Sequence, residues 1–112
     1  MAKVFSATVQ TTTVTPNNTL FIAEQIIVGV AALQLSSIII PDGITLVLKS
    51  YVGNKNNKII YVGNSAINVL VAATRIELRP GESVGLSVQN ANVVFVAASA
   101  AGVILELLVE QD

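Results

Sequence analysis

Apolar side chains recur at every second position through most of the sequence, and this spacing limits the possible fold more than any other feature. Residues 44–52 and 103–109 show it most clearly. Turn-forming clusters such as Pro41-Asp42-Gly43 separate these runs about every ten residues, with no room for the intervening helices of a βαβ fold. We therefore predict an all-β chain, with residues 1–112 forming a single-domain, jelly-roll-like antiparallel β-sandwich of about eight strands.

The same pattern predicts where the strands lie. We expect them over residues 3–14, 20–30, 33–40, 44–52, 58–62, 75–78, 84–88, 93–98 and 103–109, with a helical turn possible within 66–74. Residues 20–30 are apolar on both faces except for Glu24 and Gln25, which predicts a strand covered on both sides. In 44–52 we expect Val52 on the core face, and the Gly- and Asn-rich residues 53–57 to form a hairpin with 58–62.

The composition excludes several classes of function. The chain has no His and no Cys, so Ser-His and Cys-His nucleophile pairs, zinc sites and haem or iron–sulfur ligation are excluded. Six basic and seven acidic residues give a net charge of −1 without a basic run, and we predict no binding of nucleic acid. We expect a protein that is not an enzyme and binds neither a cofactor nor a metal.

Hydropathy predicts contact with protein rather than with a membrane. The uncharged stretches 25–41 and 83–105 are interrupted by polar residues, so neither reads as a spanning helix, and the first residues do not read as a secretory signal. We therefore expect synthesis in a cytoplasm. Hydrophobic residues are nevertheless 53% of the chain and charged residues 12%, more apolar side chain than a core of this size usually hides. Part of this surplus is predicted to contact a partner, with a homo-oligomer (dimer or trimer) expected.

Two segments supply the candidate interface residues. On the last strand Ile104, Glu106, Leu108 and Glu110 alternate apolar with acidic on the side away from the expected core. Residues 1–14 could act as an interacting N-terminal strand or arm that adds to the edge of a neighbour's sheet. The interface candidates are Phe5, Val9, Val14, Ile104 and Leu108.

An alternative site follows from a short repeat, Tyr-Val-Gly-Asn at 51–54 and again at 61–64. The two tyrosines and the Asn-rich loop could form a platform for a glycan or receptor, and Tyr51, Asn54, Asn56 and Tyr61 are its candidate residues. The acid pairs Glu77 with Glu82 and Glu106 with Glu110 are interpreted as solvated surface charge rather than as catalytic carboxylates.

Three runs in order carry a family resemblance: KIIYVGNS at 58–65, LRPGESVGLSVQN at 78–90 and VFVAASAAG at 94–102. Together they resemble small virion proteins of tailed bacteriophages, over roughly residues 44–109. The resemblance implies a non-enzymatic jelly roll on the virus particle, most simply a head decoration or cement protein on the capsid surface whose partner is the major capsid protein. Similar sequences also occur in tail or fibre-associated positions, which is the alternative location.

Overall fold

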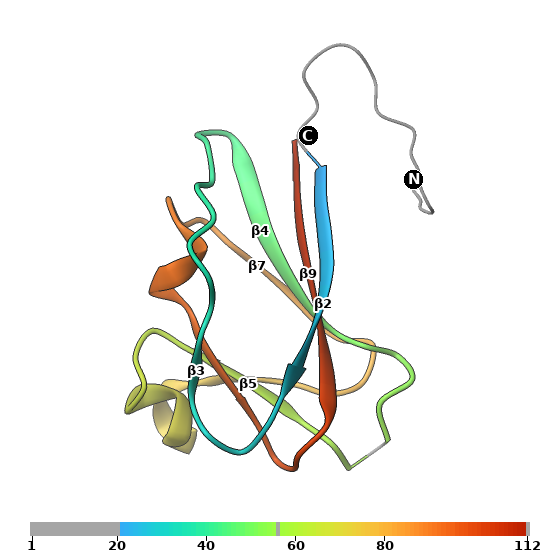
Figure 1. The fold of residues 1–112 in the computed structure, drawn as a ribbon. Helices are drawn as coiled ribbons and strands as arrows, with labels where there is room; N and C mark the ends of the chain where they lie inside the picture. The colour runs from blue at the N-terminus through green and yellow to red at the C-terminus, as the bar shows by residue number, and fades with distance from the viewer. Residues whose placement is uncertain (1–20, 56, 112) are drawn as a thin grey trace.

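The computed structural model describes residues 21–55 and 57–111, which form eight strands in two four-stranded antiparallel sheets (Figure 1). One sheet has the order β2-β9-β4-β7 and the other β3-β8-β5-β6. This order is that of a jelly roll, in which successive strands cross between two packed sheets. The predicted fold class, an all-β antiparallel sandwich of about eight strands, is confirmed.

The strands of the first sheet are β2 (Phe21–Val28), β4 (Ile44–Ser50), β7 (Ser83–Leu86) and β9 (Val103–Gln111). Those of the second are β3 (Leu33–Gln34), β5 (Ile60–Gly63), β6 (Ile76–Leu78) and β8 (Phe95–Ala98). Three short 3₁₀ turns complete the described chain: η1 (Asn68–Leu70), η2 (Ala72–Thr74) and η3 (Ala91–Val93). The helical turn expected within 66–74 is thus present.

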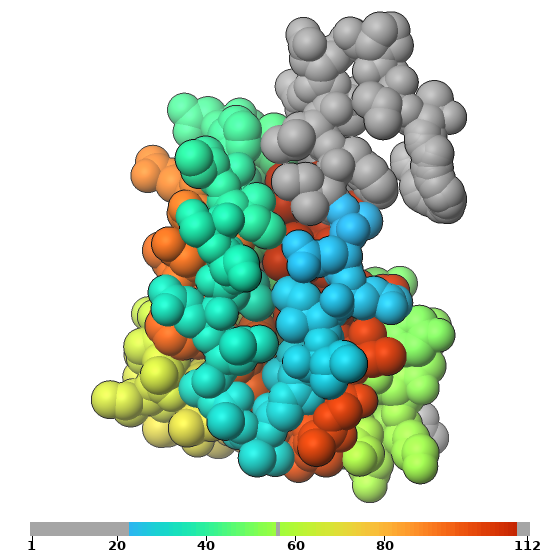
Figure 2. Space-filling view, viewed as in Figure 1, coloured from blue at the N-terminus to red at the C-terminus, as the bar shows by residue number. Residues whose placement is uncertain are grey.

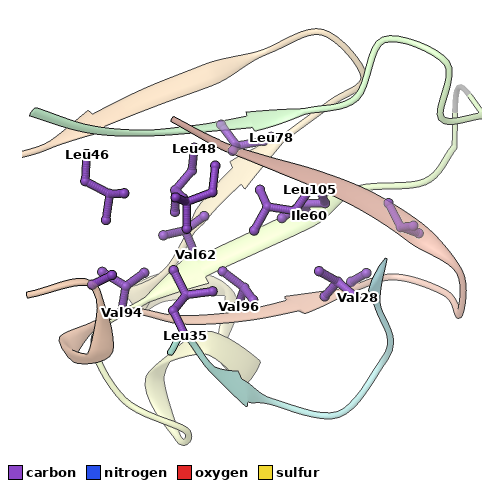
Figure 3. Close-up of a cluster of buried hydrophobic side chains, with 14 of the residues drawn as sticks. Val28, Leu35, Leu46, Leu48, Ile60, Val62, Leu78, Val94, Val96 and Leu105 are labelled. Atoms are coloured by element: carbon purple, nitrogen blue, oxygen red, sulfur yellow. The ribbon is translucent and has the colours of Figure 1, made fainter. Parts of the chain in front are cut away.

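The core lies between the sheets, where every second residue of the central strands points inward (Figure 3). From β4 and β9 the buried side chains are Leu46, Leu48, Val103, Leu105, Leu107 and Val109, and from the facing sheet Ile60, Val62, Leu78, Val96 and Ala98. Val84, Leu86 and Val88 pack against this cluster, as their alternation predicts. Because the inward positions of β9 are so regular, its outward positions 104, 106 and 108 are also fixed.

Two expectations about the first sheet are wrong. Within the described residues, strand β2 pairs with β9 alone, and its side chains at 23, 25 and 27 are exposed, so it is not covered on both sides. Val52 is 69% exposed, because β4 ends at Ser50, the last inward residue, and the chain turns immediately afterwards. Figure 2 shows β2, in blue, on the surface of the molecule.

The expected hairpin of 44–52 with 58–62 is also wrong, because β4 and β5 belong to different sheets. The loop between them crosses the sandwich. Of the expected strand 33–40, only Leu33 and Gln34 form a strand, β3. Residues 38 and 40 instead make single hydrogen bonds to the segment after β7. The amide of Ile40 donates to the Gln89 carbonyl at 2.8 Å, and the Asn90 Oδ1 accepts from the amide of Ile38 at 3.0 Å.

Candidate interaction surface

The outward side of the β2-β9-β4-β7 sheet, called the outer face below, carries side chains in rows across the strands. One row is polar and contains Gln25, Glu106 and Lys49, which are register partners on β2, β9 and β4. The rows on either side are apolar: Ile27 with Ile104, and Ala23, Leu108 and Val47 with Gly85 of β7. Of these, Ile27 is 75% exposed, while Val47, Ile104 and Leu108 are half-buried by their neighbours.

The polar row is only partly paired within the molecule. Gln25 Nε2 donates a hydrogen bond to Glu106 Oε2 at 3.1 Å. Lys49 is exposed and lies beside Glu106 in the register. The two side chains do not form an ion pair, because the pair found within 4.0 Å among residues 21–55 and 57–111 is Arg75 with Glu77. A shallow hollow of about 540 Å³ lies over these residues, bordered by Ala23, Val47 and Leu108. The outer face is therefore an apolar surface with one central acid and one central base.

The outward side of the other sheet is covered by the chain itself. Turn η1 packs against Gly63 so closely that a Cβ there would lie 2.8 Å from the Val69 Cα, and Val69 is fully buried. The Arg75 guanidinium lies 3.5 Å from the centre of the Tyr61 ring and is bound to Glu77 at 3.1 Å. Ala97, on the same side, is also fully buried. The two sheets thus differ: residues 65–75 cover the second, and no described segment covers the first.

A second group of apolar side chains lies on the surface of these covering turns. Ile67 is 75% exposed and Leu70 53%, and Val71 next to them is also exposed. They lie on turns that pack over the β3-β8-β5-β6 sheet, so the molecule presents apolar side chains from both of its layers.

The three described residues of the predicted ligand platform do not form one site, because Tyr51 and Asn54 share a turn after β4 while Tyr61 lies on the other sheet. Asn54 uses its amide inside the protein: Nδ2 donates to the Ile104 carbonyl at 2.8 Å and to Ser50 Oγ at 3.1 Å, while Oδ1 accepts from the Ile104 amide at 3.0 Å. The Tyr51 ring packs over Gly53, and the Tyr61 ring is stacked with Arg75 on the other sheet. Asn56 lies outside the described residues.

The interface candidates are placed as follows. Ile104 and Leu108 lie on the outer face, as predicted. Phe5, Val9 and Val14 lie outside the described residues. Sequence reasoning did not single out Ala23, Gln25, Ile27, Val47 and Lys49 for this face. The alternation in 44–52 indicated the outward side for Lys49, but residues 20–30 show no such alternation, and the pairing of β2 and β4 with β9 was needed to place these five residues beside Leu108.

Two further observations concern chemistry. Within the described ranges, no group of three or more acidic, His or Cys side chains is arranged to hold a metal. In the same residues, no helix has the length and apolar character needed to cross a membrane. The acids Glu77 and Glu82 are used locally, Glu77 with Arg75 and Glu82 accepting from the Arg79 amide at 2.8 Å.

Comparison with known proteins supports the fold alone. No protein-family model matches the sequence, and no curated protein matches it. Among solved structures the chain is similar to a Bacillus endospore appendage protein, described as part of a novel family of disulfide-linked pili. The likeness has a TM-score of 0.52 at 17% sequence identity and covers 83% of each chain. This chain has no Cys with which to form such a link.

Proposed function

We propose that this protein is a non-enzymatic structural subunit of a tailed-phage particle, which decorates the capsid surface and stabilises the shell by bridging major capsid protein subunits. The particle and the partner follow from the resemblance of residues 44–109 to small virion proteins. The bridging role is argued from the apolar side chains that the protein exposes on its outer face and on its turns η1 and η2.

The outer face is the observation that carries the proposal. No segment of residues 21–55 and 57–111 covers the outward side of the sheet with Ile27, Val47, Ile104 and Leu108, while the described turns at 65–75 cover the opposite sheet. An uncovered apolar sheet face is typical of a surface that binds another protein. The short polar row in its centre would fix the orientation of that partner.

Bridging requires a second contact, and the turns η1 and η2 offer one. Ile67, Leu70 and Val71 are exposed there, on the layer opposite the outer face. A subunit held to one neighbour by each layer binds most tightly where both neighbours are in place. It then stabilises the assembled shell by mass action, because it binds the assembled state better than the separated subunits.

The test is made on particles from cells that carry the gene. Phage particles are purified, the copies of this chain per major capsid protein are counted by quantitative mass spectrometry, and the chain is located by immunogold labelling. We expect many copies on the head. Labelling confined to tails supports the tail alternative, and absence from particles contradicts the proposal.

A variant then connects function to the outer face. Leu108→Asp places a charge in the apolar row and should remove the chain from particles. Val52→Asp is the matched control, because Val52 is equally apolar, 69% exposed and outside the outer face. If both variants enter particles as well as the natural chain does, the outer face is not the binding surface.

The alternative function, binding of a glycan or receptor, has less support because two of its candidate side chains are engaged inside the protein. Asn54 has its amide engaged, and Arg75 lies over the Tyr61 ring. Tyr61→Ala should therefore leave binding to a glycan array unchanged, and a loss of glycan binding in a folded Tyr61→Ala protein would favour the alternative.

A further inference from the structure

We propose that the outer face binds the outer face of a second copy of this chain, across a two-fold axis that runs parallel to the strands along the seam between β4 and β9. This inference rests on the proposed function and names a second copy as the neighbour on the outer face, which leaves the exposed turns with Ile67, Leu70 and Val71 of each copy to contact the capsid protein. Closed two-fold dimers are the commonest protein oligomers, and they require a surface that complements itself.

The charges on the outer face meet that requirement. Lys49 on β4 and Glu106 on β9 are register partners on either side of the seam. Rotation by 180° about an axis along the seam places each Lys49 opposite the Glu106 of the second copy. An axis across the strands would instead place like charges opposite each other. Within the described residues, Lys49 takes part in no ion pair inside its own copy.

The apolar rows of the outer face also complement themselves under this rotation. The same rotation exchanges Val47 of β4 with Leu108 of β9, because these two are also register partners across the seam. At the edges of the sheet it places Ala23 of β2 opposite Gly85 of β7, two positions with little side chain. In this row, bulky residues thus face each other in the middle of the interface and small ones at its edges. Sheets packed in this way lie about 10 Å apart, a distance that side chains of both copies fill.

The size of the face predicts a weak dimer. Eight residues of β2 extend over about 26 Å, and four strands cover about 19 Å, so the footprint is roughly 500 Å² on each copy. Two such footprints total about 1,000 Å², at the lower limit for a specific interface. We therefore expect a dimer that dissociates on dilution, with a dissociation constant on the order of micromolar.

Charge reversal tests the pairing directly. The full chain and its variants are measured by analytical ultracentrifugation from roughly 1 to 500 µM, a range that covers the expected dissociation constant. The single variants Lys49→Glu and Glu106→Lys should each weaken the dimer about tenfold or more, because each places two pairs of like charges in contact. The double variant, with both changes, should restore it. Lys55→Glu and Asp42→Lys are matched controls at exposed loop positions away from the face.

Each outcome decides the proposal. Melting curves identify a variant that is unfolded, and the double variant supplies the test if one single variant fails to fold. A natural chain that stays monomeric over the whole range overturns the inference, and so does a double variant as weak as the singles. Capsid decoration is judged separately by the presence of the chain on particles. A monomeric chain that still enters particles, and loses entry with Leu108→Asp, would show that a different protein occupies the outer face.

Discussion

Asn54 and Ile104 are joined by a closed pair of hydrogen bonds, 50 positions apart in the sequence. The Asn54 Nδ2 donates to the Ile104 carbonyl at 2.8 Å, and the Ile104 amide donates to the Asn54 Oδ1 at 3.0 Å. A side-chain amide has one donor group and one acceptor, as a peptide group does. Asn54 therefore continues the β4–β9 ladder past the point where β4 ends, and it holds the turn 51–54 against β9.

Replacing Asn54 by Ala should lower the free energy of unfolding by about 1–3 kcal/mol, because the Ile104 amide loses its half-buried acceptor while the Ile104 carbonyl keeps the Tyr51 amide as a donor. Asn54→Asp should destabilise as well, since a carboxylate cannot donate to the Ile104 carbonyl. Urea denaturation measures both. Asn57→Ala, an exposed Asn of the same loop, should change stability by less than about 0.5 kcal/mol. Equal stability of Asn54→Ala and Asn57→Ala would contradict this account.

Gly63→Ala should destabilise the protein by about 1–3 kcal/mol. A Cβ at this position would lie 2.8 Å from the Cα and 2.9 Å from the N of Val69, and backbone atoms cannot move aside as a flexible side chain does. Gly29→Ala is the control, because no atom lies within 4 Å of a Cβ built there. We expect thermal melting to separate the two variants by several degrees. A melting temperature for Gly63→Ala at or above that of Gly29→Ala would mean that η1 does not pack on β5.

Leu107 and Leu108 are neighbours in sequence on opposite sides of the same sheet, and they predict opposite effects. Leu107 is 2% exposed in the core, so Leu107→Ala should cost about 2–5 kcal/mol of stability. Leu108→Ala should cost less than half of that, and it should weaken self-association measured by ultracentrifugation. If Leu108→Ala destabilises the monomer as much as Leu107→Ala, then Leu108 serves the fold rather than the interface.

The stacking of Arg75 on Tyr61 should appear as a coupling of about 0.5–1 kcal/mol in a double-mutant cycle of Arg75→Ala with Tyr61→Leu. Arg75→Lys should retain little of this coupling, because an ammonium lacks the planar group that stacks on the ring. Chemical denaturation of the four proteins of the cycle gives the value. A coupling near zero would mean that the two side chains lie together without stabilising each other.

The sequence predicted the strands whose two sides differ most in polarity. In β9, residues 103, 105, 107 and 109 are all apolar while 106 and 110 are acidic, and the predicted core side is the observed one. Strand β2 was misread because Ile26, Ile27 and Val28 are apolar in succession. Such a run is typical of a covered strand, but here one of its sides, with Ile27, faces away from the core.

The crossing from β4 to β5 and the make-up of the outer face could not be predicted in this way. Gly- and Asn-rich residues at 53–57 permit a change of direction, but they do not determine whether the chain returns in the same sheet or crosses to the other. The polar row depends on pairings that join positions 25, 49 and 106. These pairings are set by how whole strands pack, and no local pattern in the sequence records them.

The central position of β9 in its sheet affects how the protein folds during its synthesis on the ribosome. Both β2 and β4 are synthesised long before β9, and in the finished sheet each of them pairs with β9 rather than with the other. Until residues 103–111 have emerged, the early strands lack their partner, and neither the core nor the outer face exists. Such long-range pairing slows folding, because the chain loses conformational entropy in bringing distant segments together before their contacts stabilise it. The outer face is thus complete only once β9, the last of the described strands, has been synthesised.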